Sequence, residues 1–293
     1  MPLHTIAIVS PGEMGSSVGR TLRERGYRVI TCLEGRSERT RNLAGNAGFE
    51  VCSTLDDMVV QADLIMSILV PAEAAGMAAR VAKAIRATKA DVYFADCNAI
   101  APQTVKNIER NIVSAGGKFI DGSIIGLPPD REVTRFYTSG EHAHLMDELD
   151  GKGIAIRRIS DEVGKASAIK MCYAGFTKAT SALSIAALAA AEAQGLSDEL
   201  AAEFEFSQAP AYAKMQKQIP SLPSKAYRWA GEMDEIAASF ESVGITPNFH
   251  KAAGDVYRRL SRTPFADESP EETDASRDLR QTIAGFVAAR SNS

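Results

Sequence analysis

The chain has few of the residue types that mark metal, disulfide or nucleic-acid proteins. It contains only four cysteines and four histidines in 293 residues, and its cysteines show no paired short spacing. Zinc and a disulfide framework are therefore unsupported, and a reducing cytoplasm is the expected location. The net charge is only −4, with no basic block and no interleaving of aromatic and basic residues. Nucleic acid is therefore not expected as a partner.

Targeting and membrane signals are also missing. The N-terminal residues lead into a strand-like segment without a cationic leader and a small-residue cleavage site, so no signal peptide is expected. The most apolar window, residues 182–191, lies between Lys178 and Glu192 and is too short to cross a bilayer. No membrane partner is expected, and the length allows one large or two ordinary domains.

A glycine turn follows the first apolar run, residues 5–9, and a helical pattern follows the turn. Strand, glycine turn and helix are the context that a dinucleotide-binding fingerprint requires. Gly12 would let the backbone approach a pyrophosphate, and Gly15 would let the helix pack closely on the sheet. Ser10 stands where the fingerprint has its first glycine, and a tight structural turn would give the same pattern. The predicted cofactor contacts of this turn are Ser10, Gly12, Glu13, Met14 and Gly15.

The next predicted strand, residues 27–33, ends about 20 residues beyond the turn, where such folds bind the adenosine ribose. An acidic residue there, such as Glu34, would hold the ribose hydroxyls of NAD. An arginine with a hydroxyl suits the 2′-phosphate of NADP. NADP is favoured and NAD stays possible, because Arg36 can bind phosphate with two hydrogen bonds and Ser37 can add another. Glu34 could equally lie in a solvated turn.

Strand and helix patterns then alternate, which predicts βαβ units and a parallel sheet. The strands are expected at 49–52, 64–69, 92–95, 118–120, 135–138 and 154–158. The helices between them are expected at 55–61, 73–87 and 104–115. Ligands bind such sheets at the carboxyl ends of the strands. The loops expected to rim the same crevice contain Leu69, Val70, Asn98, Ser123 and Gly126.

From residue 163 onward helical patterns dominate, so we expect an α/β domain over 1–162 and an all-helical domain over 163–293. Helices are expected over 163–196, from an N-cap at Ser197 to about 218, and over 228–243, 248–260 and 276–289, with an exposed connector over 263–273. In the first of these helices a polar stripe runs along an otherwise apolar surface. It either lines a cleft that presents its lysine to a ligand, or the lysine extends to solvent and the hydroxyls bond to the preceding turn. The stripe consists of Lys170, Tyr173, Thr177, Ser181 and Ser184.

Four stretches carry a family resemblance. They are Glu13-Met14-Gly15, residues 96–102 (DCNAIAP), residues 119–126 (FIDGSIIG), and Gly164 followed six residues later by Lys170. In this order they resemble the β-hydroxyacid dehydrogenase family, which contains 3-hydroxyisobutyrate and 6-phosphogluconate dehydrogenases. Residues 229–236 and 256–258 resemble the helical C-terminal domain of a poorly characterised branch of that family.

The resemblance implies a Rossmann-type doubly wound parallel sheet followed by an all-α domain that commonly dimerises. It also implies an oxidoreductase that transfers a hydride between NAD(P) and a hydroxyacid-type small molecule. Lys170 would be the catalytic general acid/base, and a lowered affinity for its proton would be needed for it to act as the base. The implied substrate contacts are Asn98, Ser123, Gly126 and Tyr173.

Departures from the family pattern concern the substrate. Tyr173 and Ala174 stand where the family usually has two asparagines. Residues 125–127 (IGL) stand where a Ser-Gly-Gly usually grips the acid group, so a substrate other than a small aliphatic hydroxyacid is expected. Phosphogluconate is disfavoured because no arginine cluster lies in the matching loops.

Several alternatives stay open at this point. A decarboxylating dehydrogenase and an imine reductase could both use the same scaffold. A helical dimer that binds a dinucleotide without chemistry would explain the missing glycine and the lost asparagines. Trp229 and His250 could reach an active site, even that of a partner subunit, although core packing or a surface position is the more common role of a single such residue.

Overall fold

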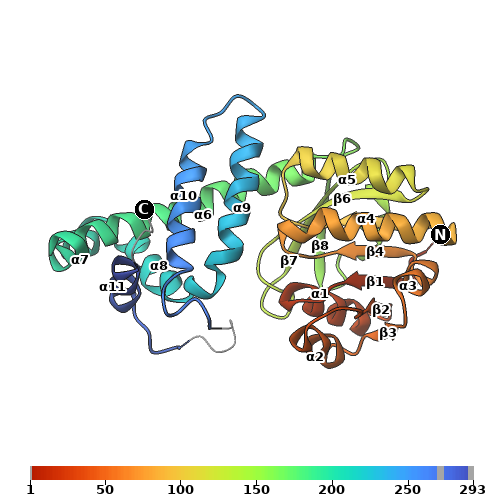
Figure 1. Cartoon of the computed structure of the whole chain (residues 1–293), viewed down its shortest axis with the longest axis horizontal. Coiled ribbons are helices and arrows are strands. Elements are labelled where there is room, and N and C mark those ends of the chain that lie inside the picture. Colours follow the sequence, from red (N-terminus) through yellow and green to blue (C-terminus); the bar gives the residue numbers. More distant parts are fainter. Residues whose placement is uncertain (1, 269–273, 290–293) are drawn as a thin grey trace. The chain divides into compact units, whose positions relative to one another are not determined.

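The computed structural model describes residues 2–268 and 274–289 of the chain. They belong to two compact units, Met1–Met171 and Cys172–Ser293. The first unit is a sheet with helices and the second is built from helices alone (Figure 1). The division falls within the long helix α6 (Lys165–Gln194), whereas the sequence placed it before this helix. Lys170 therefore lies in the first unit.

The sheet of the first unit has eight strands in the order β3-β2-β1-β4-β5-β6-β7-β8. Strands β1 to β6 are all parallel to their neighbours, β7 is antiparallel to β6, and β8 is parallel to β7. This order confirms the predicted Rossmann-type sheet. The strands are β1 (Thr5–Val9), β2 (Arg28–Cys32), β3 (Glu50–Cys52), β4 (Leu64–Ser67), β5 (Tyr93–Asp96), β6 (Lys118–Ile125), β7 (Thr134–Ser139) and β8 (Ile154–Ser160).

Two buried apolar clusters cover the two faces of this sheet. Side chains alternate along β1, so Ile6 and Ile8 belong to one cluster and Ala7 and Val9 to the other. The strand is buried on both faces, which explains its continuous apolar run. The first cluster includes side chains of α1 (Glu13–Glu24), α2 (Glu38–Asn46) and the 3-10 helix η1 (Ala143–Leu149), and the second those of α3 (Leu55–Gln61), α4 (Pro71–Thr88) and α5 (Pro102–Ser114).

Local differences from the sequence prediction have physical causes. Helix α2 was missed because Ala44 is its only buried residue, which leaves almost no apolar periodicity. Strand β6 was expected to end at residue 120 and continues to Ile125, because β7 pairs with residues 121–125. A partner strand, which the segment's own sequence does not show, sets that length.

The second unit contains the part of α6 after Met171 and five further α-helices within the described residues. The single helix expected after Ser197 is wrong, because Gln208 separates two helices with φ −135°. Pro210 in the first turn of the second one favours a new helix start. The expected N-cap at Ser197 is also wrong, since Leu196 holds that position. The helices are α7 (Ser197–Ser207), α8 (Ala209–Gln218), α9 (Pro223–Glu241), α10 (Asn248–Leu260) and α11 (Leu279–Ala288), with the 3-10 turn η2 (Ile219–Ser221) between α8 and α9.

The last of these helices and the connector before it were only partly anticipated. Helix α11 begins after Asp278, which forms a capping box with Gln281, rather than at residue 276. Of the expected exposed connector, residues 269–273 lie outside the described part of the chain.

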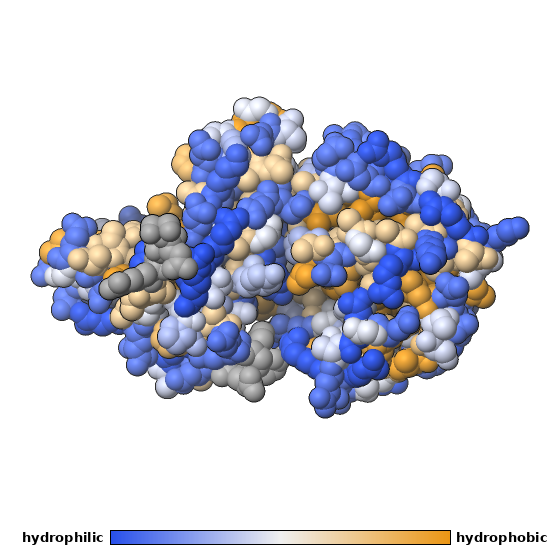
Figure 2. All heavy atoms as spheres, viewed as in Figure 1, coloured by the Kyte–Doolittle hydropathy of each residue, from blue (hydrophilic) through white to orange (hydrophobic). Residues whose placement is uncertain are grey.

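Helix α6 is apolar and long. By length and composition it could cross a membrane, with a mean hydropathy of 1.2 in its most apolar window, but half of that window is buried. A core helix of a soluble protein has the same properties. Hydrophilic residues dominate the face shown in Figure 2, with apolar residues in patches between them. Such a mixture is ordinary for a protein surface.

Candidate functional site

The glycine turn joins β1 to α1. Ser10 has φ +54°, which is the left-handed region that glycine adopts without steric cost. Gly12 is the N-cap of α1, and a Cβ there would meet no atom within 4 Å. The backbone at Gly12 is therefore open to a bound group. The serine in place of the first glycine keeps the shape of the turn but costs about 1–3 kcal/mol in backbone strain.

Helix α1 is packed closely on the sheet at Gly15, where a Cβ would lie 3.2 Å from Ile8 Cγ2. The N–H groups of its first turn have no partner within the helix and form an anion-binding end. The Glu13 carboxylate at this end pairs with Arg131 at 3.1 Å, and the Ser17 hydroxyl donates to Asp130 at 2.8 Å. This open, close-packed cradle fits the pyrophosphate of a dinucleotide.

The predicted ribose site follows β2. The Ser37 hydroxyl accepts the N–H of Thr40 at 3.3 Å and caps α2. Glu34 pairs with Arg80 of α4 at 3.7 Å, which brings in a cation that sequence reasoning missed. Burial lowers the pKa of Arg36, and the positive charge of Arg80 lowers it further. The positive charges of Arg36 and Arg80 thus repel each other, and a bound negative group would offset that repulsion.

Asn98 links two loops at the carboxyl edge of the sheet. Its side-chain carbonyl accepts the Leu69 N–H at 2.5 Å, and its amide donates to the Ser67 hydroxyl at 3.0 Å. Val70 is the N-cap of α4 beyond this point. The side chain of Asn98 is only 2% exposed, so it holds Leu69 in place beside the cradle.

Two buried aspartates lie opposite each other on neighbouring strands, Asp96 at the end of β5 and Asp121 within β6. One oxygen of Asp96 accepts the Asn98 N–H at 3.0 Å, and the other has no hydrogen-bond partner among the described residues. Burial raises the pKa of Asp96 to about 7, and the charge of Asp121 also raises it. The sequence offered a signal for both groups, since each aspartate follows a buried strand run.

Asp121 fixes the start of α6. Its carboxylate accepts hydrogen bonds from the backbone N–H groups of Gly164 (2.8 Å) and Ser167 (3.2 Å), and from the hydroxyls of Ser139 (2.8 Å) and Ser167 (2.7 Å). Burial raises the pKa of Asp121, and these hydrogen bonds oppose that effect. Gly164 has φ +104°, so the glycine six residues before the lysine is required by the backbone.

Lys170 lies just beyond this anchored helix start. Its amine donates to the carbonyl oxygen of Ile124 at 2.6 Å, near the carboxyl end of β6. The neighbouring Ser123 hydroxyl is fully buried and has no hydrogen-bond partner among the described residues. Lys170 and Ser123 thus come together at the edge of the sheet that also carries the glycine turn.

The remaining hydroxyls of the predicted stripe do not form a site. Thr177 and Ser181 each donate to a carbonyl of the preceding turn of α6, and Ser184 does the same. Tyr173 belongs to the second unit and is half exposed. Of the two interpretations of the stripe, back-bonding is right for these hydroxyls. No cluster of three potential metal ligands occurs in the described parts of the chain.

Trp229 has a packing role. Its ring lies 4.8 Å from the Lys178 amine and contacts Tyr257 edge-on at 5.3 Å. Lys178 also pairs with Glu232, and both side chains are almost fully buried. This buried ion pair was not predicted, because a lysine beside an apolar stretch is equally typical of a residue at the end of a buried segment.

The sheet order, the open cradle at the N-terminus of α1 and the following β2 loop are those of an α/β protein that binds a dinucleotide. Residues 5–130 match the NAD binding domain of 6-phosphogluconate dehydrogenase, and residues 191–260 match a domain of unknown function, DUF1932. These two matches support the resemblance to the β-hydroxyacid dehydrogenase family that the sequence motifs indicate. The chain is a dinucleotide-dependent oxidoreductase.

Relatives cover nearly the whole chain. An uncharacterised 28.5 kDa protein of Methanothermus fervidus is 28% identical over 87% of this chain and 98% of its own. A solved protein of unknown function, described as similar to 3-hydroxyacid dehydrogenases, is 28% identical, covering 87% of this chain and 96% of its own with a TM-score of 0.65.

Two enzymes share the fold at lower identity. The 3-hydroxyisobutyrate dehydrogenase of Mycobacterium tuberculosis, solved with L-serine, is 17% identical, covering 99% of this chain and 100% of its own with a TM-score of 0.69. An imine reductase variant of Myxococcus stipitatus, solved with NAD+, is 16% identical, covering 98% and 100% with a TM-score of 0.56.

Proposed function

We propose that the enzyme transfers a hydride between NADP and a hydroxyacid, with Lys170 as the general acid/base. The observation that carries this proposal is the hydrogen bond of 2.6 Å from the Lys170 amine to Ile124 at the carboxyl end of β6. Asp121 supports it by holding the start of α6 with three hydrogen bonds. A group on a fixed element near the binding edge can transfer a proton in a defined direction.

A bound nicotinamide supplies the hydride acceptor in oxidation and the hydride donor in reduction. In oxidation, neutral Lys170 takes the hydroxyl proton of the substrate as the carbinol C–H bond breaks. In reduction, protonated Lys170 gives its proton to the carbonyl oxygen. The Ile124 carbonyl accepts one N–H of Lys170 and so orients the amine during both steps.

Substrate contacts would come from the same edge. The Ser123 hydroxyl is buried without a described partner, and such a group is stabilised by a ligand that bonds it. The Asn98 amide uses one N–H for Ser67 and has a second to offer. The backbone at Gly126 completes the proposed set on the first unit, and Tyr173, which belongs to the second unit, stays a prediction.

Lys170 can be tested directly. We expect Lys170→Ala to bind NADPH like the parent protein and to lower turnover by about 10²–10⁴-fold. The matched control is Lys165→Ala, because Lys165 lies on the same helix and pairs with Glu162 at 3.2 Å on the surface. The assay follows reduced-nicotinamide absorbance with aliphatic and aromatic hydroxyacids and with cyclic imines. Equal turnover by the two variants would contradict the role of Lys170.

The same panel separates the alternatives. Turnover of imines but not hydroxyacids would indicate an imine reductase, and release of carbon dioxide would indicate oxidative decarboxylation. Tight cofactor binding without turnover across the panel would indicate a dinucleotide-binding protein without chemistry.

The preference for NADP rests on Arg36, Arg80 and the Ser37 hydroxyl at the start of α2. The 2′-phosphate would pair with both arginines, and Glu34 would give up its contact of 3.7 Å to Arg80. We expect Arg80→Gln to weaken NADPH binding about tenfold and leave NADH binding unchanged. Arg86→Gln is the control, since Arg86 lies on the same helix and donates to Ser114. Equal losses for NADPH and NADH would refute the 2′-phosphate contact.

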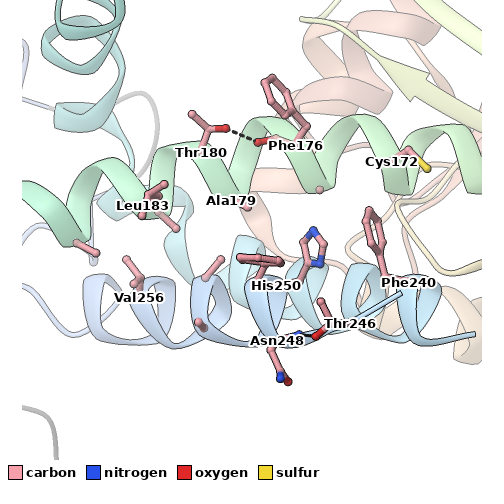
Figure 3. Close-up of a pocket in the computed structure, with 16 residues that line it drawn as sticks. Cys172, Phe176, Ala179, Thr180, Leu183, Phe240, Thr246, Asn248, His250 and Val256 are labelled. Atoms are coloured by element: carbon pink, nitrogen blue, oxygen red, sulfur yellow. Dashed lines mark hydrogen bonds between the residues drawn. The ribbon is translucent and has the colours of Figure 1, made fainter. Parts of the chain in front are cut away.

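We also propose that the enzyme is a homodimer through its helical unit. A groove of about 830 Å³ between α6 and α10 is lined mostly by apolar side chains (Figure 3). Phe176, Leu183 and Phe249 line it and are each more than 70% exposed. Large exposed apolar residues gathered at one place are typical of an interaction surface. His250 is buried in the same groove against Phe240.

Sedimentation can test this assembly. We expect Phe176→Glu and Leu183→Glu to shift the protein from dimer to monomer, because each places a charge in the proposed interface. The exposed Phe206 of α7 lies outside the groove, and Phe206→Glu serves as the control. A parent protein that is monomeric at micromolar concentration would refute the dimer.

A further inference from the structure

The loop after β6, residues 126–133, folds back on itself through an acidic side chain. Glu132 Oε1 accepts the N–H of Leu127 at 2.9 Å. Gly126 has φ +127°, and a Cβ there would lie 2.5 Å from Glu132 Oε1 and 3.5 Å from Arg135 Nη2. A carboxylate and a guanidinium therefore both lie against the backbone of Gly126. Only glycine leaves room for this arrangement.

Arg135 points toward the face of the sheet on which α6 begins. It lies opposite Ile125 in the antiparallel β6–β7 pair, and Ser139 lies opposite Asp121. Side chains alternate along a strand, so Arg135 and Ser139 share one face. The Ser139 hydroxyl bonds to Asp121 and to the Ala166 N–H, which places the start of α6 on that face.

Lys170 lies near this arginine. Its amine bonds to the carbonyl of Ile124, which directly precedes the residue opposite Arg135. Gly126 is two residues further along, or about 7 Å at the rise of a strand. A small molecule with two polar ends could therefore reach Lys170 with one end and the Gly126 backbone with the other.

Arg135 is held only loosely. Its ion pair with Glu132 measures 3.9 Å, which is longer than a hydrogen bond, and both side chains are about 40% exposed. The two donors that face the Glu132 carboxylate are the Leu127 N–H and the Arg135 guanidinium. An arginine and a backbone N–H are the groups that bind a carboxylate well.

We propose that the Leu127 N–H and the Arg135 guanidinium form the subsite for the substrate's carboxylate, and that Glu132 occupies it until the substrate displaces it. This inference rests on the proposed oxidation of a hydroxyacid by Lys170, and it names the group that selects the acid. Arg135 would hold the acid group in place of the Ser-Gly-Gly that the family usually has at residues 125–127.

The tethered carboxylate of Glu132 competes with the substrate. Because it is only five residues from Leu127 and three from Arg135, its effective concentration at the subsite is high. Its removal should therefore strengthen acid binding, whereas removal of Arg135 should weaken it. Loss of folding cannot mimic a gain in affinity, so the Glu132 variant keeps the test independent of protein damage.

Leucine-labelled protein can report on the subsite directly. The enzyme, ¹⁵N-labelled at leucine and loaded with NADP+, is titrated with 3-hydroxy-3-phenylpropanoate and, separately, with its neutral amide, because a small aliphatic hydroxyacid is not the expected substrate. We expect the acid but not the amide to shift the Leu127 amide resonance. Glu132→Gln should bind the acid at least threefold more tightly, and Arg135→Gln at least tenfold more weakly.

Arg157→Gln is the matched control. Arg157 has an ion pair of the same length, 3.9 Å to Asp150, on the neighbouring strand β8, and its replacement should leave acid affinity unchanged. Equal binding of acid and amide would overturn the subsite. So would an unshifted Leu127 amide resonance at acid concentrations up to about 0.1 M. Unchanged acid affinity in either Glu132→Gln or Arg135→Gln would overturn it as well.

Turnover on the same samples separates the two proposals. If Leu127 responds to the acid but no compound in the panel changes cofactor absorbance, the subsite stands and the proposed oxidoreductase chemistry fails. The opposite result is turnover of alcohols or imines with no acid-induced shift of the Leu127 resonance and no effect of Arg135→Gln on acid affinity. In that case the chemistry stands and the subsite fails.

Discussion

Replacing Asp96 with asparagine should remove part of the pH dependence of stability. The Asp96 carboxyl is fully buried, and one of its oxygens accepts the Asn98 N–H at 3.0 Å. An asparagine carbonyl can keep this hydrogen bond, while the second oxygen has no described partner to lose. The substitution therefore removes the titration and little else.

The sign follows from the proton count. The pKa of Asp96 is about 7 in the folded protein and 3.8 ordinarily, so between these values the folded protein keeps a proton that the unfolded chain has lost. Parent stability consequently falls as pH rises through this window. At about 1.4 kcal/mol for each pH unit, a window of about three units gives about 4 kcal/mol. This loss of parent stability is absent below about pH 4 and complete above about pH 8.

Urea unfolding at pH 4.5 and pH 8 measures this effect. Relative to the parent, Asp96→Asn should gain roughly 3–4 kcal/mol in its free energy of unfolding between the two pH values. Asp56→Asn, an exposed position in the first turn of α3, corrects for general effects of charge. A change below about 0.5 kcal/mol for Asp96→Asn would refute the assignment of a proton to the buried carboxyl.

Substitutions at three further sites test the framework of the two units. Asp121→Ala should lower the free energy of unfolding by about 3 kcal/mol or more, because it leaves buried donors at the start of α6 unpaired; urea unfolding measures it, and a loss under 1 kcal/mol would contradict the anchor. Glu232→Gln should cost about 3–5 kcal/mol because it removes the negative charge that is paired with the buried Lys178, whereas replacing both partners by Leu and Met should restore most of the lost stability. Ser10→Val should cost about 1–2 kcal/mol because a β-branched residue resists φ +54°, whereas Ser10→Gly should be tolerated; equal stability of the two would exclude strain at the turn.

Periodicity and turn chemistry identified most of the first unit in advance. Helices α3 and α10 have the predicted bounds, and the buried strands were visible as apolar runs between glycine and proline signals. What failed were features that depend on a partner. Strand β6 is longer than its own pattern indicates because β7 pairs with it, and α2 buries too little to leave a pattern.

The candidate site shows the same limit. The glycine turn and Lys170 could be found because each requires a particular residue at a fixed spacing. Arg80 and Arg135 could not, since each acts through a neighbour that only the fold provides, Arg80 beside Arg36 and Arg135 opposite Ile125. A charged residue on an exposed helix or an edge of a sheet gives no signal until its neighbours are known.

The distribution of cysteines has a practical consequence for experiments. Cys32, Cys52 and Cys97 are buried, whereas Cys172 is exposed and lines the apolar groove of the second unit. A maleimide dye should therefore react with one thiol, and it should react faster with the monomer than with the proposed dimer. Its fluorescence would report how the groove is covered as the protein is diluted.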